Sequence, residues 1–174
     1  MGTMVEGYMH VRALHIVFAA LWVGAAVFLT LYVSPAIRAL GPAGAPLMAE
    51  LMRRRMSAFF AASAILTVLS GAWMYCQFTH GLDAAIVRQG IGLALGFGGI
   101  CGIAAAVIGA TVISRSAERA GKLSREAAQL PEGPERGATM QTVAALQRRV
   151  AVFARFNTVL LVVALLAMCL AHGM

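Results

Sequence analysis

Four long apolar stretches, none containing Asp, Glu or Lys, constrain this chain more than any other feature. A stretch of about 20 apolar residues is long enough to cross a bilayer core as an α-helix. We expect spans at about 11–33, 57–78, 89–113 and 151–171, with the first ending at Ser34–Pro35. The sequence therefore predicts an all-α polytopic membrane protein, in which residues 1–174 form a single antiparallel bundle of four transmembrane helices.

The composition excludes several other classes of protein. Hydrophobic residues make up 60% of the chain and charged residues only 12%, whereas soluble domains carry about 25% charged residues. Intrinsic disorder requires low hydrophobicity, and the mean hydropathy here is +0.81. Three cysteines in 174 residues are too few for a disulfide-stapled scaffold. The first apolar stretch is longer than the core of a signal peptide and is interpreted as a retained span.

The basic residues predict the orientation of the bundle. Twelve of the 14 Lys and Arg residues fall between spans one and two, or near the connection of spans three and four; Arg12 and Arg88 are the exceptions. Basic residues favour the cytoplasmic side of a membrane. We therefore expect a protein of a bacterial-type cytoplasmic membrane with both termini outside the cytoplasm. The net charge of +7 is then a consequence of topology, and no nucleic-acid partner is predicted.

The segment 114–150 between spans three and four is the longest polar region. Residues 114–129 continue the third span as a charged helix, and Pro131, Gly133, Pro134 and Gly137 predict a break. A helical pattern resumes after this break and runs into span four. We expect a helical hairpin that extends into the cytoplasm.

The four histidines all fall in the predicted outer third of the molecule: His10, His15, His80 and His172. Sulfur-bearing residues share this bias: Met9, Met74, Met168, Cys76 and Cys169. Imidazole, thiolate and thioether groups suit copper, zinc or haem iron. The same residues are also ordinary packing residues, and Cys76 and Cys169 are candidates for a disulfide.

His15 is the strongest candidate ligand because it lies about 6 Å inside span one. It shares a helical stripe with Phe18 and Trp22, which offers no counter-ion for a charged imidazole. A neutral ring with one nitrogen available for a metal is expected. A hydrogen bond between helices is the alternative role.

Glycine marks one face of span three, at Gly92, Gly96 and Gly99, and Gly98 adds a second pattern with Gly102. Such a face favours close approach of another helix, and a flat porphyrin ring is the alternative occupant. Arg12 and Arg88 are either partners for haem propionates or end anchors. Asn157 is expected to form a hydrogen bond between helices.

Span one carries a recognisable arrangement of residues: Leu14-His15, then Leu21-Trp22-Val23-Gly24, followed by Phe28 and Pro35. It resembles the opening span of CopD-like membrane proteins and their HemJ-type protoporphyrinogen oxidase relatives. Residues 65–75 and 154–157 resemble other parts of this family. The resemblance implies a four-helix membrane bundle, with His15 as the family histidine and a link to haem or copper. HemJ-type proteins carry a membrane-embedded lysine, whereas the only lysine here is Lys122, outside the spans.

The leading hypothesis is a bundle that binds a b-type haem or copper near its outer face, as an oxidoreductase or a metal-handling protein. His15 is the first ligand in this hypothesis, and His80, His172 or Met168 is its partner; His10 is a further metal candidate. Trp22, Arg12 and Arg88 complete the expected cofactor site, and no catalytic residue is singled out. Quinol and a periplasmic redox protein are the expected electron partners. The alternatives are a cofactor-free accessory subunit of a larger membrane complex and a copper transporter.

Overall fold

The computed structural model describes residues 2–171, and His172 lies outside them. The structure is 91% helical, and the described part contains no strand. Among these residues, four helices are long and apolar enough to cross a membrane: Glu6–Ala39, Met56–Phe78, Gly90–Gln129 and Pro134–Leu170. The prediction of an all-α chain with four membrane-spanning helices is confirmed to this extent.

The first half of the chain builds one long helix, one short helix and a second span. Helix α1 (Gly2–Phe28) continues through a π-helical segment, η1 (Leu29–Val33), into α2 (Ser34–Ala39). A 3-10 turn, η2 (Gly41–Ala43), leads to α3 (Gly44–Arg53), which is followed by α4 (Met56–Phe78).

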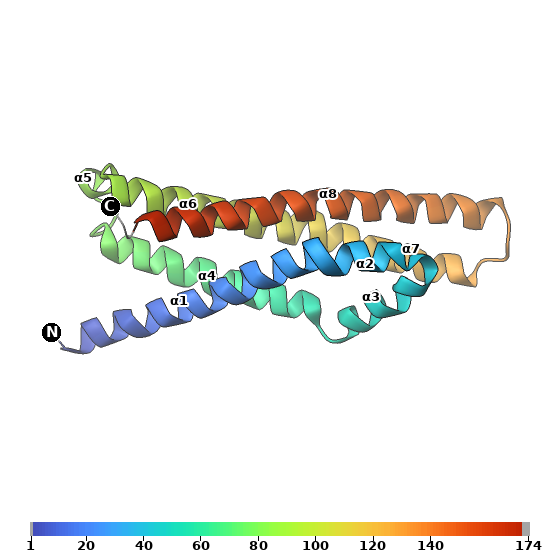
Figure 1. Cartoon of the computed structure of the whole chain (residues 1–174), viewed down its shortest axis with the longest axis horizontal. Helices are drawn as coiled ribbons and strands as arrows, with labels where there is room; N and C mark the ends of the chain where they lie inside the picture. Colours follow the sequence, from blue (N-terminus) through green and yellow to red (C-terminus); the bar gives the residue numbers. More distant parts are fainter. Residues whose placement is uncertain (1, 172–174) are drawn as a thin grey trace.

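The second half contains the two longest helical runs. After the short α5 (Ala84–Val87), α6 (Gly90–Ile108) continues through a second π-helical segment, η3 (Gly109–Ser114), into α7 (Arg115–Gln129). Helix α8 (Pro134–Leu170) then runs along most of the length of the molecule (Figure 1). At 1.5 Å per residue its 37 residues extend about 55 Å, roughly 25 Å more than a bilayer core requires.

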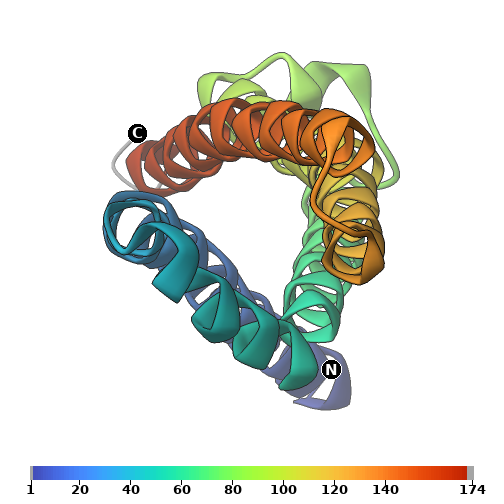
Figure 2. The same ribbon diagram turned by 90° about the vertical axis from the view of Figure 1, so that its right-hand side faces the viewer.

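The helices associate as two pairs. Helix α1 packs along α4, and α8 packs along both α6 and α7, while α4 with α6 and α1 with α8 join the pairs. Figure 2 shows these helices arranged around the bundle axis. We call the end with Gly2, α5 and Leu170 the terminal end, and the end with α3 and the α7–α8 connection the hairpin end (Figure 1). Helix α1 lies close to α8 at η1 and diverges from it toward Gly2.

The prediction that the first span ends at Ser34–Pro35 is wrong, because the helix passes through Pro35 to Ala39. Proline has no N–H and crowds the preceding turn of a helix. The chain accommodates Pro35 with η1, in which the Ser34 N–H bonds to the carbonyl of Leu29, five residues back. The predicted break at 130–137 is likewise shorter, since Pro134 starts α8 at a position where its missing N–H costs nothing.

A small apolar core joins three of the four spans. Trp22 and Ala26 of α1, Ala105 of α6 and Leu161 of α8 are buried together, with partly buried side chains of α4 packed against them. Many other large apolar side chains are exposed, including Ile16, Leu69 and Leu166. In a membrane-spanning helix such side chains face lipid, so exposure here carries no penalty.

Threonines rather than Asn157 make the polar contact of α8 with η1 and the end of α1. The hydroxyls of Thr30 and Thr158 lie 2.9 Å apart, and Thr158 also reaches the Ala26 carbonyl at 3.5 Å. Asn157 is 7% exposed, and its Oδ1 has no hydrogen-bond partner among the described residues. The expectation that Asn157 bonds between helices is therefore wrong; its neighbour, one residue further round the helix, takes that role.

We predict that Asn157→Leu stabilises the protein. A buried polar atom without a partner costs about 1–3 kcal/mol, and leucine has a similar volume without that cost. The expected result is an increase of that size in the free energy of unfolding, measured by denaturant titration in detergent. Thr158→Val is the matched control, and it should lower stability because it removes the bond to Thr30. A loss of stability in Asn157→Leu would contradict the prediction.

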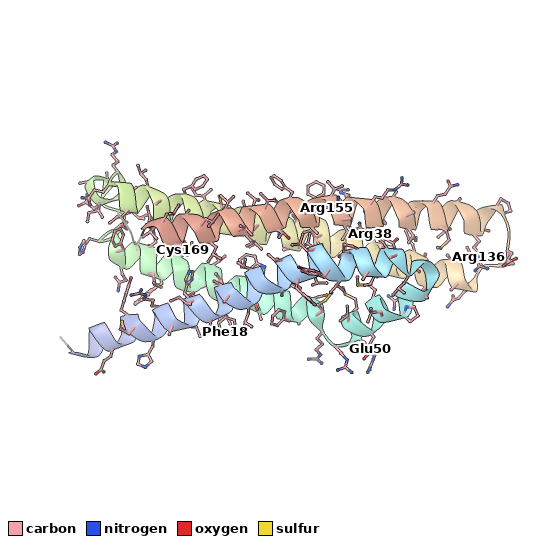
Figure 3. The ribbon with its side chains drawn as sticks, viewed as in Figure 1. Phe18, Arg38, Glu50, Arg136, Arg155 and Cys169 are labelled. Atoms are coloured by element: carbon pink, nitrogen blue, oxygen red, sulfur yellow. The ribbon has the colours of Figure 1, made fainter. Side chains whose placement is uncertain are left out.

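The first part of α8 and the whole of α7 form a helical hairpin beyond the apolar segments. The side of α7 that packs on α8 is buried, at Ser116, Ala120 and Ala127. Val143 of α8 is also buried. Small side chains let the two backbones approach closely. Figure 3 places Arg136 near the tip of this hairpin and Glu50 on α3, where Glu50 pairs with Arg53 and Arg54 at 2.7 and 2.8 Å.

Candidate functional site

His15 lies in the contact between α1 and α4. Its Nδ1 is 2.9 Å from the carbonyl oxygen of Thr67 and 3.1 Å from Oγ of Ser70. A carbonyl oxygen can only accept, so Nδ1 must carry the proton and donate it. The ring is therefore oriented by α4.

Ser70 is placed to accept this hydrogen bond. It is buried on the inner side of α4, and its hydroxyl donates to the carbonyl of Leu66, one turn earlier. The hydroxyl proton is thus used within α4, and an Oγ lone pair faces His15. Since Nδ1 holds the ring proton, Nε2 of a neutral imidazole carries a free lone pair. Nε2 forms no hydrogen bond with any residue in 2–171.

Gly71 makes room for the imidazole. A Cβ added at Gly71 would lie 2.8 Å from Cε1 and 3.2 Å from Nδ1 of His15. Non-bonded carbon atoms do not approach so closely, so a side chain at this position would displace the ring or separate the helices. The sequence alone gives Gly71 no role beyond its place in residues 65–75. Its role becomes visible once α1 and α4 are paired.

The other predicted ligands in residues 2–171 each have surroundings of their own. His10 is exposed, and its Nδ1 bonds to the Glu6 carbonyl at 2.7 Å. His80 is exposed in the turn after α4, where its φ of 49° is unusual for a residue with a Cβ. Met168 is half-buried on α8, where its side chain faces Gly98 of α6. Within the described residues, no three His, Cys, Asp or Glu side chains cluster as a metal site.

The remaining residues of the predicted cofactor site lie on α1 and at the end of α5, apart from His172. Trp22 is a core residue, with 4% of its surface exposed. Arg12 is half-buried on α1 and Arg88 is exposed at the end of α5. His172 lies outside the described residues. Cys76 and Cys169 are both free, so the candidate disulfide is not formed.

The glycine-rich face of α6 contacts helices at some positions and open space at others. A Cβ at Gly98 would lie 3.1 Å from the carbonyl oxygen of Ala164 in α8, and one at Gly96 would lie 2.9 Å from the Tyr75 hydroxyl of α4. That hydroxyl donates to the Gly92 carbonyl at 3.1 Å. Gly99 and Gly102 have nothing within 4 Å. Glycine therefore permits close packing of α6 against both neighbours.

Comparisons with protein-family models, with curated proteins and with solved structures give no match to this chain. The site must therefore be interpreted from its own geometry.

Proposed function

We propose that the chain is a membrane redox protein that binds a b-type haem through Nε2 of His15. The observation that carries this proposal is the donor bond from Nδ1 to the Thr67 carbonyl. Histidines that bind metals commonly donate their other ring N–H to a carbonyl or carboxylate, which fixes the ring and raises the basicity of the ligating nitrogen. His15 has this arrangement, whereas Nδ1 of the exposed His10 bonds only within its own helix.

The donor set favours haem over copper. A copper site needs several protein ligands at once, and residues 2–171 do not bring three candidate ligands together. Haem iron takes four nitrogens from its own porphyrin, so a single correctly supported imidazole is enough to hold it. His15 fits this requirement, and Arg12, three residues earlier on α1, is a predicted partner for a propionate. When bound, haem supplies one-electron transfer; the chain supplies the ligand, its orientation and an apolar surrounding.

The resemblance of span one to CopD-like and HemJ-like proteins supports the same assignment, as does the position of His15 toward the terminal end. We further propose that this end faces away from the cytoplasm, because 12 of the 14 basic residues lie toward the other end or its connections. Electrons would then pass between a membrane quinol and an acceptor on the outer side.

We predict that His15→Ala removes the haem spectrum. The protein is expressed in membranes and purified in mild detergent with added haemin. It should then show the Soret absorption band of a b-type haem. His15→Ala should lose more haem affinity than the roughly 10–100-fold that the loss of an outer-shell hydrogen-bond partner costs, because it removes the ligand itself. His10→Ala is the matched control on the same helix and should keep the band. Folded wild-type protein that takes up no haem would refute the proposal.

The second candidate is a cofactor-free subunit of a larger membrane complex. One observation favours it: the bond of His15 to Thr67 and Ser70 already joins α1 to α4 without any ligand. In this case wild type would be colourless, would co-purify with larger subunits, and His15→Ala would lower stability by about 1 kcal/mol. The haem spectra and the stabilities of wild type and His15→Ala therefore separate the two candidate functions.

A further inference from the structure

We propose that Arg115, Arg119 and Lys122 of α7 bind the phosphate of an anionic phospholipid headgroup. These three side chains, together with Glu118, line an open hollow of about 360 Å³ at the base of the hairpin. The site lies on a different helix and toward the other end of the molecule from His15, so it is independent of the haem proposal.

The spacing puts the three cations on one flank of α7. Buried Ser116, Ala120 and Ala127 fix which side of the helix faces α8. At about 100° per residue, positions 115, 119 and 122 lie together roughly 110° round the helix from that buried seam. All three residues are therefore held on a single exposed flank by the packing of the hairpin.

The cations are available for an external anion. The ion pairs among residues 2–171 join Glu50 to Arg53 and Arg54, and Glu132 to Arg136. Glu118 lies in the hollow but pairs with none of its basic neighbours, so the hollow keeps a local charge of about +2. Arginine binds phosphate oxygens through two N–H groups, and lysine adds a point charge.

The depth of the flank matches the headgroup layer. The apolar run of the third helix ends at Ile113, and Arg115 follows directly after η3. Lys122 is seven residues further, or about 10 Å along the axis. The polar layer on each side of a bilayer is roughly 5–8 Å thick. The flank thus spans this layer, where basic pockets at the inner ends of spans bind anionic lipids.

The test compares two lipids and two charge-matched variants of the full chain. Wild type in neutral detergent receives phosphatidylglycerol or phosphatidylcholine at equal mole fraction, and its Tm is measured at physiological salt. Phosphatidylglycerol should raise Tm by about 5 °C more than phosphatidylcholine does. The variant Arg115→Gln/Arg119→Gln/Lys122→Gln should lose most of this difference. The control Arg125→Gln/Arg136→Gln/Arg148→Gln removes three charges elsewhere on the hairpin and should keep it.

Three results would overturn the proposal. The first is no difference between the lipids, and the second is an equal loss in both variants, which would indicate attraction by overall charge. The third is an equal rise in Tm with inorganic phosphate alone, which would indicate a free-anion site. The single variant Arg119→Gln guards against misfolding of the triple variant, and it should lose part of the lipid effect. Native mass spectrometry should show a retained phosphatidylglycerol on wild type and the control, and not on the triple variant.

Discussion

Trp22→Ala is expected to lower the free energy of unfolding by about 3–5 kcal/mol, the usual cost of emptying a buried aromatic site. Trp22 is 4% exposed and lies in the core where α1, α6 and α8 meet. Lipid cannot fill a cavity enclosed by helices, so the lost contacts are not replaced. Equilibrium denaturation of the detergent-solubilised protein, followed by helical circular dichroism, measures the change.

Trp73 provides the matched control for this experiment. It is 41% exposed on α4, and its ring contacts Tyr8 with 6.0 Å between the ring centroids. Trp73→Ala should therefore cost about 1 kcal/mol, the value of one aromatic contact. Equal losses for the two tryptophans would show that the core at Trp22 does not hold the bundle together.

The four spans could be predicted from the sequence because hydrophobic length alone determines them. Their ends were harder to predict, since Pro35 and Pro134 both suggested breaks. Proline ends a helix only where the surrounding structure cannot accommodate its missing N–H. At Pro35 the π-helical segment η1 accommodates it, and Pro134 lies in the first turn of α8. Neither arrangement is encoded by proline itself.

The rotation of each helix could not be predicted, because a helix that is apolar all round gives no signal of which side faces its neighbours. The consequence is visible in adjacent residues. Thr158 makes the hydrogen bond between helices that was expected of Asn157, and Gly98 contacts α8 while Gly99 faces open space. Positions one residue apart differ by about 100° round the helix, which decides between a contact and lipid.

The candidate site was predicted in part. The depth of His15 singled it out from sequence, since ionisable side chains inside spans are rare. Its partners Thr67 and Ser70 lie more than 50 residues away along the chain, and they carry no motif of their own. Only the pairing of α1 with α4 reveals them. The residues grouped with His15 by their shared depth, such as His10, turn out to have other surroundings.

Gly71→Leu is the second substitution with a large expected effect, because it should both destabilise the fold and displace the His15 ring. A Cβ at this position would lie 2.8 Å from Cε1 of His15. The ring must move, and it then loses its bonds to Thr67 and Ser70. Overpacking and the lost hydrogen bonds together should cost about 2–4 kcal/mol of stability. Denaturant titration measures this loss, and the haem spectrum of the same sample measures the state of the ligand.

Gly24→Leu is the control, since a Cβ at Gly24 has nothing within 4 Å and leucine there would face lipid. It should leave both stability and spectrum close to those of wild type. If His15 holds the haem, Gly71→Leu should weaken the Soret band as His15→Ala does, although His15 itself is intact. If Gly71→Leu binds haem fully but is less stable than wild type, the orientation of the imidazole by α4 serves the fold alone. The Nδ1 bond would then no longer support haem ligation by His15.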